Sequence, residues 1–195
     1  MWVLIVVVLV LALALVSGQY RLAALQNQYQ LAWAEVETQL RERHNWVSHW
    51  VQIAKTVVQQ EQSSLKTVIE ARQAAMRALK NLQHQPEQNR SMQEWLRSEA
   101  EFTQSLRDLR AFVQTTPELL AHPDLVPLRA DLRQIELQLL SASEQYNKVC
   151  SQYNLYRRGF PHNGVAKALG YTQDALLLPI DKTVAFKDAH FLAEA

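Results

Sequence analysis

The sequence predicts an all-α protein in which an N-terminal transmembrane helix continues into the long first helix of an antiparallel helical bundle. Three observations support this fold class. Residues 1–16 carry no charge, residues 19–85 contain neither proline nor glycine, and the whole 195-residue chain has only 4 glycines. Apolar residues then recur at steps of three and four, which is the spacing of one face of an α-helix.

Residues 1–20 are predicted to be a transmembrane anchor, because about 20 apolar residues are enough to cross a bilayer as a helix. The first charge is Arg21. A cleavable signal peptide is the alternative, with Ala12 and Ala14 as small residues near a cleavage site, but no basic residue precedes the apolar run. Because flanking arginines tend to stay cytoplasmic, we expect a cytoplasmic body with the N-terminus outside, and an external body remains open.

Residues 21–158 are predicted to form the helical body, with helices at about 21–85, 91–115 and 124–158. The first segment is one long helix, or two helices joined without a loop, and Pro86 ends it. If unbroken, it would extend roughly 95 Å. Ser91 is predicted to cap the second helix, with Glu94 as its capping-box partner.

A connection rich in proline separates the second and third helices, and its prolines are Pro117, Pro123 and Pro127. The third helix tolerates proline in its first turn, and its apolar residues from Leu128 to Tyr153 follow steps of four and three without a break. Residues 159–195 are predicted to be a C-terminal tail with a short amphipathic segment at 163–169.

The predicted helix lengths bear on assembly. The second and third helices, at about 40 and 50 Å, cannot cover a first helix of 95 Å. Either the first helix folds back, or copies of the chain pack together; we favour self-assembly into a homo-oligomer, since an extended apolar stripe marks an interface. Trp33, Trp46 and Trp50 are the candidate subunit contacts, with core packing or interfacial membrane contact as alternatives for Trp46 and Trp50.

Composition and motifs indicate no catalytic or cofactor chemistry. Lys and Arg number 20 and Asp and Glu 19, so the net charge of +1 predicts no nucleic-acid partner. Cys150 is the sole cysteine, which excludes an internal disulfide and is typical of a small buried residue. The six histidines lack the spacing of a metal site on a helix. We therefore expect a protein that is not an enzyme and has no catalytic residues, cofactor or metal.

Two Tyr-Asn pairs, Tyr146-Asn147 and Tyr153-Asn154, lie seven residues apart, so both tyrosines fall on the apolar stripe with the asparagines beside it. One interpretation is structural: the tyrosines pack, and their hydroxyls and the asparagines hydrogen-bond to neighbouring helices or to the tail. The other is that this segment captures a ligand or a partner together with a second group of residues, which are Phe160, Pro161 and Asn163.

These residues resemble the LemA family, and the resemblance runs nearly end to end. Its further elements, in order, are Trp33 with Val36 and Leu40, Glu70-Ala71-Arg72, Pro123-Asp124-Leu125, Glu136, Ala166, Gly170-Tyr171, Val184 and Phe186. Ser143 departs from the family, which usually has an arginine there as a partner for Glu136. The resemblance implies one membrane helix followed by a helical body, a place in the bacterial cytoplasmic membrane, and no enzymatic activity; some relatives are tied to building magnetosome membranes.

The function predicted from the sequence is that of a non-enzymatic, membrane-anchored helical scaffold that self-assembles into a ring- or cage-like oligomer. The lipid bilayer is its predicted partner through residues 1–20, and an unidentified membrane protein is a further one. The alternative is a membrane-localised sensing or binding module, which would use the Tyr-Asn pairs and the Phe160-Pro161 segment to capture a ligand or protein.

Overall fold

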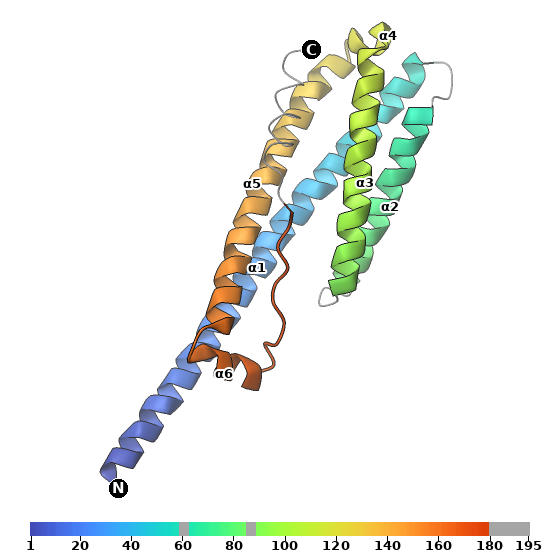
Figure 1. Cartoon of the computed structure of the whole chain (residues 1–195). Coiled ribbons are helices and arrows are strands. Elements are labelled where there is room, and N and C mark those ends of the chain that lie inside the picture. The colour runs from blue at the N-terminus through green and yellow to red at the C-terminus, as the bar shows by residue number, and fades with distance from the viewer. Residues whose placement is uncertain (59–62, 85–88, 180–195) are drawn as a thin grey trace. The chain divides into compact units, whose positions relative to one another are not determined.

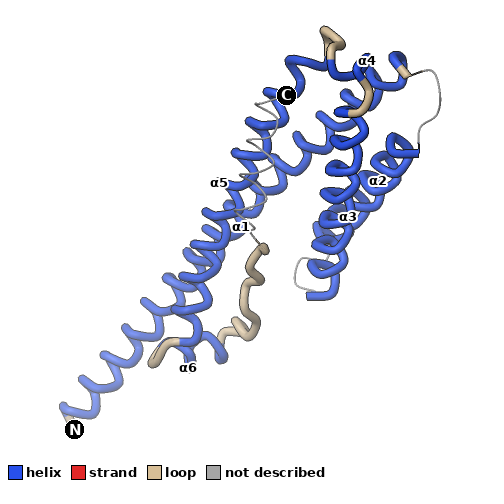
Figure 2. The backbone as a smooth tube through the Cα atoms, turned by 45° about the horizontal axis from the view of Figure 1, so that its top comes forward, coloured by secondary structure: helices blue, strands red, loops and turns tan. Residues whose placement is uncertain are grey.

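The computed structural model describes residues 1–58, 63–84 and 89–179, and within them it contains helices and no strand (Figures 1 and 2). The helices are α1 (Trp2–Val57), α2 (Ser63–His84), α3 (Asn89–Gln114), α4 (Pro117–Leu120), α5 (Leu125–Arg158) and α6 (His162–Ala168). The all-α prediction is confirmed. The chain divides into unit 1 (Met1–Gln39 and Gln138–Val184) and unit 2 (Leu40–Leu137 and Ala185–Ala195), so α1 and α5 contribute to both units.

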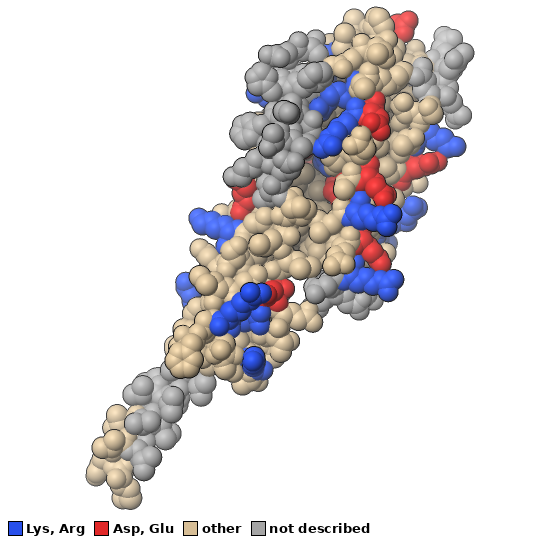
Figure 3. All heavy atoms as spheres, viewed as in Figure 1, with Lys and Arg blue, Asp and Glu red and all other residues tan. Residues whose placement is uncertain are grey.

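The N-terminal part of α1 bears on the predicted membrane anchor. Among the residues that the structure describes, no helix meets the length and apolarity needed to cross a bilayer. The transmembrane helix predicted at residues 1–20 is therefore not supported by the structure. The side chains at positions 4, 7, 8 and 10–15 lie outside the described part. The other side chains at this end of α1 carry no charge (Figure 3).

The first predicted helix is divided. Helix α1 ends at Val57 and α2 begins at Ser63, and residues 59–62 lie outside the described part. Helix α2 packs against α3 and shares an apolar cluster with the end of α1, so the chain folds back. The fold-back buries the apolar stripe that a single long helix would expose. Self-assembly therefore does not follow from the predicted helix lengths.

The core of unit 2 is an apolar cluster drawn from α1, α2, α3, α4 and the start of α5. Phe102 lies at its centre and has no exposed surface. The buried members are Val47, Trp50, Val51, Ala54, Leu65, Val68, Ala75, Phe102, Leu109, Leu119 and Leu125. Burial of side chains of this size stabilises the fold by about 1.5–3 kcal/mol each, so this cluster holds unit 2 together.

The helix boundaries in unit 2 differ from the prediction at two places. Helix α3 begins at Asn89, so Ser91 lies inside the helix, where it is buried, and it is not the N-cap. Helix α4 was not predicted; Pro117 occupies its first turn, where the missing N–H costs nothing, and Leu119 is fully buried. Tertiary burial of Leu119 favours a helical turn that proline spacing alone does not indicate.

Unit 1 joins the N-terminal part of α1 to the C-terminal part of α5, to α6 and to the residues after α6. Its apolar cluster contains Leu22, Leu25, Tyr153 and Ala166. Helix α6 lies at the predicted amphipathic segment and ends at Ala168, two residues before Gly170, whose φ is +86°. The amide of Tyr171 donates to the carbonyl of Ala166 at 2.8 Å, as in a Schellman motif, where glycine is favoured because other residues rarely adopt positive φ.

Residues 172–179 follow α6 without helical structure, and we call this segment the strap. In Figure 1 the strap leaves α6 and runs in an extended path, and Figure 2 draws it as loop. Leu178 of the strap is buried, whereas its neighbour Leu177 is exposed. The strap places the last described part of the chain against the Tyr-Asn segment of α5.

Candidate functional site

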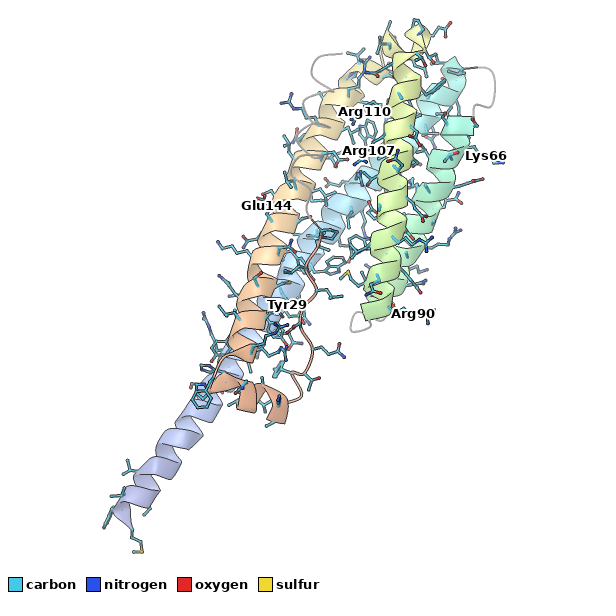
Figure 4. All side chains as sticks on the ribbon, in the orientation of Figure 1. Tyr29, Lys66, Arg90, Arg107, Arg110 and Glu144 are labelled. Carbon is cyan, nitrogen blue, oxygen red and sulfur yellow. The ribbon has the colours of Figure 1, made fainter. Side chains whose placement is uncertain are left out.

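The Tyr-Asn segment of α5 packs on α1 through aromatic rings. The rings of Tyr29 and Tyr153 meet edge to face with their centroids 5.1 Å apart, and those of Trp33 and Tyr146 do so at 5.6 Å. Figure 4 shows Tyr29 on α1 among side chains beside the strap. Edge-to-face pairs contribute beyond their buried area, so these contacts fix how α5 turns about its own axis. The asparagine of each pair then faces the strap.

Asn154 binds the main chain of the strap through both ends of its amide. Its Nδ2 donates to the carbonyl oxygen of Ala175 at 2.8 Å, and the amide of Ala175 donates to its Oδ1 at 2.8 Å. A side-chain amide has the donor and acceptor pattern of a peptide group. Asn154 therefore pairs with the main chain of one strap residue as a neighbouring β-strand would.

Asn147 repeats this arrangement three residues further along the strap. Its Nδ2 donates to the carbonyl oxygen of Leu178 at 2.8 Å, and the amide of Leu178 donates to its Oδ1 at 2.7 Å. Between the two pairs, the hydroxyl of Tyr146 donates to the carbonyl oxygen of Leu176 at 3.0 Å. Five hydrogen bonds between three side chains of α5 and the main chain thus hold three of the four strap residues 175–178.

The spacing of the two asparagines matches the spacing of the main-chain groups that they bind. Seven residues of α-helix advance by about 10.5 Å, and three residues of extended chain advance by about 10 Å. Asn147 and Asn154 are seven apart, and their partners Leu178 and Ala175 are three apart. The interval of seven in the sequence is therefore the period at which a helix can run antiparallel to an extended peptide and bind it twice.

Charge fixes the other end of the strap. Arg157 and Arg158 both bind the carboxylate of Asp174, and the Nη1 of Arg157 also donates to the carbonyl oxygen of Thr172 at 3.1 Å. Asp174 precedes the first residue that Asn154 binds. The two basic residues at the end of α5 therefore set the register of the strap.

The second group of predicted site residues does not join the asparagines. Phe160 is 91% exposed, Pro161 follows it through a cis peptide bond, and Asn163 is exposed on α6. Tyr153 is buried in the apolar cluster of unit 1. The structure thus brings Tyr146, Asn147 and Asn154 to the strap, and it agrees with the structural interpretation of hydrogen bonds to the tail.

Burial keeps the groups beneath the strap in their neutral forms. Burial, and next the adjacent Cys150, raises the pKa of Tyr146, and burial raises the pKa of the Cys150 thiol to about 11. Burial, together with Tyr29, also raises the pKa of Tyr153. The tyrosine hydroxyl is therefore a hydrogen-bond donor across the physiological pH range, and the thiol is unreactive.

Unit 2 contains a buried charge network centred on Arg43. Its Nε donates to Glu136 at 2.7 Å, its Nη1 to Glu99 at 2.8 Å and its Nη2 to Thr103 at 3.2 Å. Arg43 is 4% exposed, and its guanidinium lies 5.1 Å from the centre of the Phe102 ring. One guanidinium thus neutralises two carboxylates from different helices and ties α1 to α3 and α5.

His44 extends this network and sits fully buried. Its Nε2 lies 3.2 Å from Glu99, and its ring stacks on Phe102 with centroids 4.5 Å apart. Burial alone would raise the pKa of Glu99, but the hydrogen bond to His44 and the charge of Arg43 outweigh it and lower that pKa. Burial lowers the pKa of Arg43, whereas Glu136 and Glu99 raise it by more, so the pKa of Arg43 is raised overall. The network is therefore charged at neutral pH.

Sequence reasoning missed this network. The sequence pattern did not single out Arg43, His44 or Glu99. A usable signal existed, because Arg43 and His44 fall among the apolar positions Leu40 and Val47 at helical spacing. Glu136 pairs with Arg43 at 2.7 Å, whereas Ser143 carries no charge to offer it.

Two of the predicted contact tryptophans lie in the core of unit 2. Trp50 is 4% exposed, and the indole N–H of Trp46 donates to the carbonyl oxygen of Leu128 at 2.8 Å. Their rings stack with centroids 6.4 Å apart. Both tryptophans line a cavity of about 70 Å³, partly open to solvent, to which α3 contributes Arg107 and Arg110 (Figure 4). Core packing, one of the alternatives left open, describes these two residues.

The described residues contain no group of three or more His, Cys, Asp or Glu side chains that could hold a metal ion. What the arrangement does offer is binding: an extended peptide lies along a helix, held through its main chain. The fold and this site define a class of protein, a helical bundle that binds its own tail along an asparagine-bearing helix.

Within that class, the comparison with protein families shows to which family the chain belongs. The LemA family model matches residues 32–184, so the chain belongs to the LemA family. The matched range includes α5, α6 and the strap. No curated protein matches the chain.

Proposed function

We propose that this LemA-family protein is a non-enzymatic scaffold that is attached to a membrane through residues 1–20 and self-associates into a ring- or cage-like oligomer. One observation carries the self-association: large apolar side chains are exposed on unit 1. Leu155 is 77% exposed, Phe160 is 91% exposed, and Leu31 is 63% exposed. Isolated exposed apolar residues are ordinary, but groups of them mark interfaces.

Further exposed apolar residues of unit 1 lie between the last turn of α5 and the strap. Leu155 lies in the last turn of α5, Phe160 in the connection and Leu169 directly after α6. Leu177 of the strap is also exposed, at 50%. A second copy that covers these side chains removes apolar surface from water, which supports association through unit 1.

Membrane attachment is supported by the sequence and by the family. Residues 1–16 carry no charge, and Trp2 and Tyr20, which are 81% and 75% exposed, flank the apolar run as interfacial aromatics do. A vesicle flotation assay with the full chain tests the anchor. Val8→Arg combined with Leu11→Arg is expected to abolish flotation, because charge at the bilayer centre is costly. The control Gln28→Arg combined with Gln30→Arg adds the same charge outside the run, and flotation of all three chains, or of none, refutes the anchor.

Self-association is tested by the mass of the full chain in detergent, measured by light scattering after size-exclusion chromatography. A defined multimer is expected for the natural chain and for the control Gln152→Ala, which changes an exposed polar residue of α5. Leu155→Gln combined with Phe160→Gln is expected to shift the mass toward the 22.4 kDa of a single chain. A single-chain mass at every concentration of the natural protein refutes the scaffold. Electron microscopy of the multimer tests the ring or cage shape.

The sensing alternative is constrained by the strap. Tyr146, Asn147 and Asn154 already bind residues 175–178 of the same chain. Any partner that uses them has to supply an extended peptide in place of the strap.

A further inference from the structure

We propose that the strap-binding face of α5 is a general site for an extended peptide main chain, and that in the assembled protein the strap of one copy binds α5 of a neighbouring copy. This inference rests on the proposed self-association and names the contact that carries it. The occupant is residues 172–179 of a second copy. The argument has three steps.

The first step is that recognition uses main-chain atoms. Four of the five hydrogen bonds join an asparagine amide to the peptide groups of Ala175 and Leu178, and the fifth joins Tyr146 to the carbonyl of Leu176. None depends on a strap side chain. Peptide sites that work in this way bind an added strand through its backbone and select it through pockets for alternate side chains. The face is therefore a peptide site that the chain's own strap occupies.

The second step is that selectivity matches this protein's own segment. A peptide that binds here needs a carboxylate to pair with Arg157 and Arg158, and Asp174 supplies it. Four residues later it needs an apolar side chain that can be buried, and Leu178 supplies that. The arginines carry positive charge at the end of the helix where the strap enters. A second copy brings the same acidic and apolar residues in the same register.

The third step is that exchange conserves the contacts. A strap from a neighbouring copy makes the same hydrogen bonds, ion pairs and apolar contacts as the strap in the same chain, so the exchanged state differs only in its connection. That connection passes through Gly170, at φ +86°, where no atom lies within 4 Å of an added Cβ. Once copies are held side by side, the neighbouring strap has a high effective concentration. Domain swapping is accessible under these conditions.

The test mixes two full-length variants that each lack one half of the site. The first, uniformly labelled with ¹⁵N, carries Asn147→Leu and Asn154→Leu, so it has an intact strap and a disabled helix. The second, unlabelled, carries Leu178→Asp, so it has an intact helix and a disabled strap. Hydrogen exchange followed by mass spectrometry reads the labelled strap peptide alone, because its mass is distinct. The buried amides of Ala175 and Leu178 report binding.

Alone, the labelled chain is expected to exchange its strap amides at least tenfold faster than the natural protein. In the mixture, we expect protection to return to the labelled strap. A matched mixture whose unlabelled chain also carries both asparagine substitutions is expected to give no protection. Circular dichroism of each chain confirms that the helices are intact.

The outcomes separate this inference from the proposed function. If the two variants co-assemble by mass and the labelled strap stays unprotected, strap exchange is refuted and the scaffold stands. If the mixture contains single chains only, self-association is refuted, and this inference falls with it. Equal protection in the test and control mixtures also refutes it, since the asparagines then do not bind the strap between copies.

Discussion

Arg43 is the residue whose replacement is expected to cost the most stability in unit 2. Arg43→Met keeps an unbranched apolar stem in place of that of arginine, and it removes the guanidinium with its three hydrogen bonds to Glu99, Glu136 and Thr103. The side chains of Glu99 and Glu136 are only 12% and 18% exposed, so the variant buries two carboxylates without their common cation. Breaking a buried pair on one side costs about 3–5 kcal/mol, and we expect a loss in that range at pH 7.

The same network predicts how this loss depends on pH. The folded pKa of Glu99 lies below its ordinary value of 4.5. Its contribution to stability is therefore present above that ordinary value and is lost as the pH falls through the lower folded pKa. In Arg43→Met the Glu99 carboxylate takes up a proton more readily, because burial favours its neutral form and the charge of Arg43 no longer opposes this. The difference between the natural chain and Arg43→Met is thus expected to shrink as the pH falls from 7 toward 4.5.

The assay is urea unfolding of the full chain in detergent, followed by circular dichroism and tryptophan fluorescence at several pH values. Arg97→Met is the matched control: Arg97 pairs with Glu101 at 3.1 Å, but the two side chains are 83% and 60% exposed. An exposed pair of this kind contributes only about 0.3–0.5 kcal/mol. If Arg43→Met costs no more than Arg97→Met, or if its cost does not change with pH, the assigned role of the network is wrong.

Three further predictions concern unit 1. Gly170→Ala is expected to lower the free energy of unfolding in urea by about 1 kcal/mol, because φ is +86° at this position. Gly164→Ala lies inside α6, where the added Cβ meets open space, and it is expected to raise that free energy by about 0.5–1 kcal/mol. Equal effects of the two substitutions would contradict the Schellman motif at Gly170. Asn154→Asp keeps an oxygen that accepts from the Ala175 amide and loses only the donor to the Ala175 carbonyl, so it is expected to speed hydrogen exchange of that amide less than Asn154→Ala, which removes both; an Asn154→Ala chain that exchanges this amide as slowly as the natural chain would refute the paired hydrogen bonds. Cys150, fully buried with its pKa raised to about 11, is expected to react with a maleimide at pH 7.5 at least tenfold more slowly in the folded chain than in urea, and equal rates would show that the thiol is exposed.

Local pattern was enough to predict the helices of this protein and several of their ends. Apolar spacing located α5, from Leu125 to Arg158, and the amphipathic segment that forms α6. Both are determined by side-chain periodicity within one element, which the sequence displays directly. The apolar run at residues 1–16 is an equally plain sequence feature, and it supports the proposed anchor.

Long-range partners could not be predicted in the same way. Periodicity places Arg43 on a helix face, but it does not say that Glu99 and Glu136, 56 and 93 residues away, meet it there. The fold-back between α1 and α2 is a similar case, since burial of the Val47 to Ala54 stripe against α2 and α3 outweighs the pattern of a continuous helix.

The Tyr-Asn segment shows where the two kinds of information meet. The sequence by itself determined that both tyrosines lie on the buried face of a helix and that both asparagines lie beside it, because seven residues are close to two helical turns. Only the tertiary structure decided what Asn147 and Asn154 bind. The strap reaches them through a turn at Gly170 and supplies main-chain groups, and hydrogen bonds to a main chain leave no required side-chain partner for a sequence pattern to reveal.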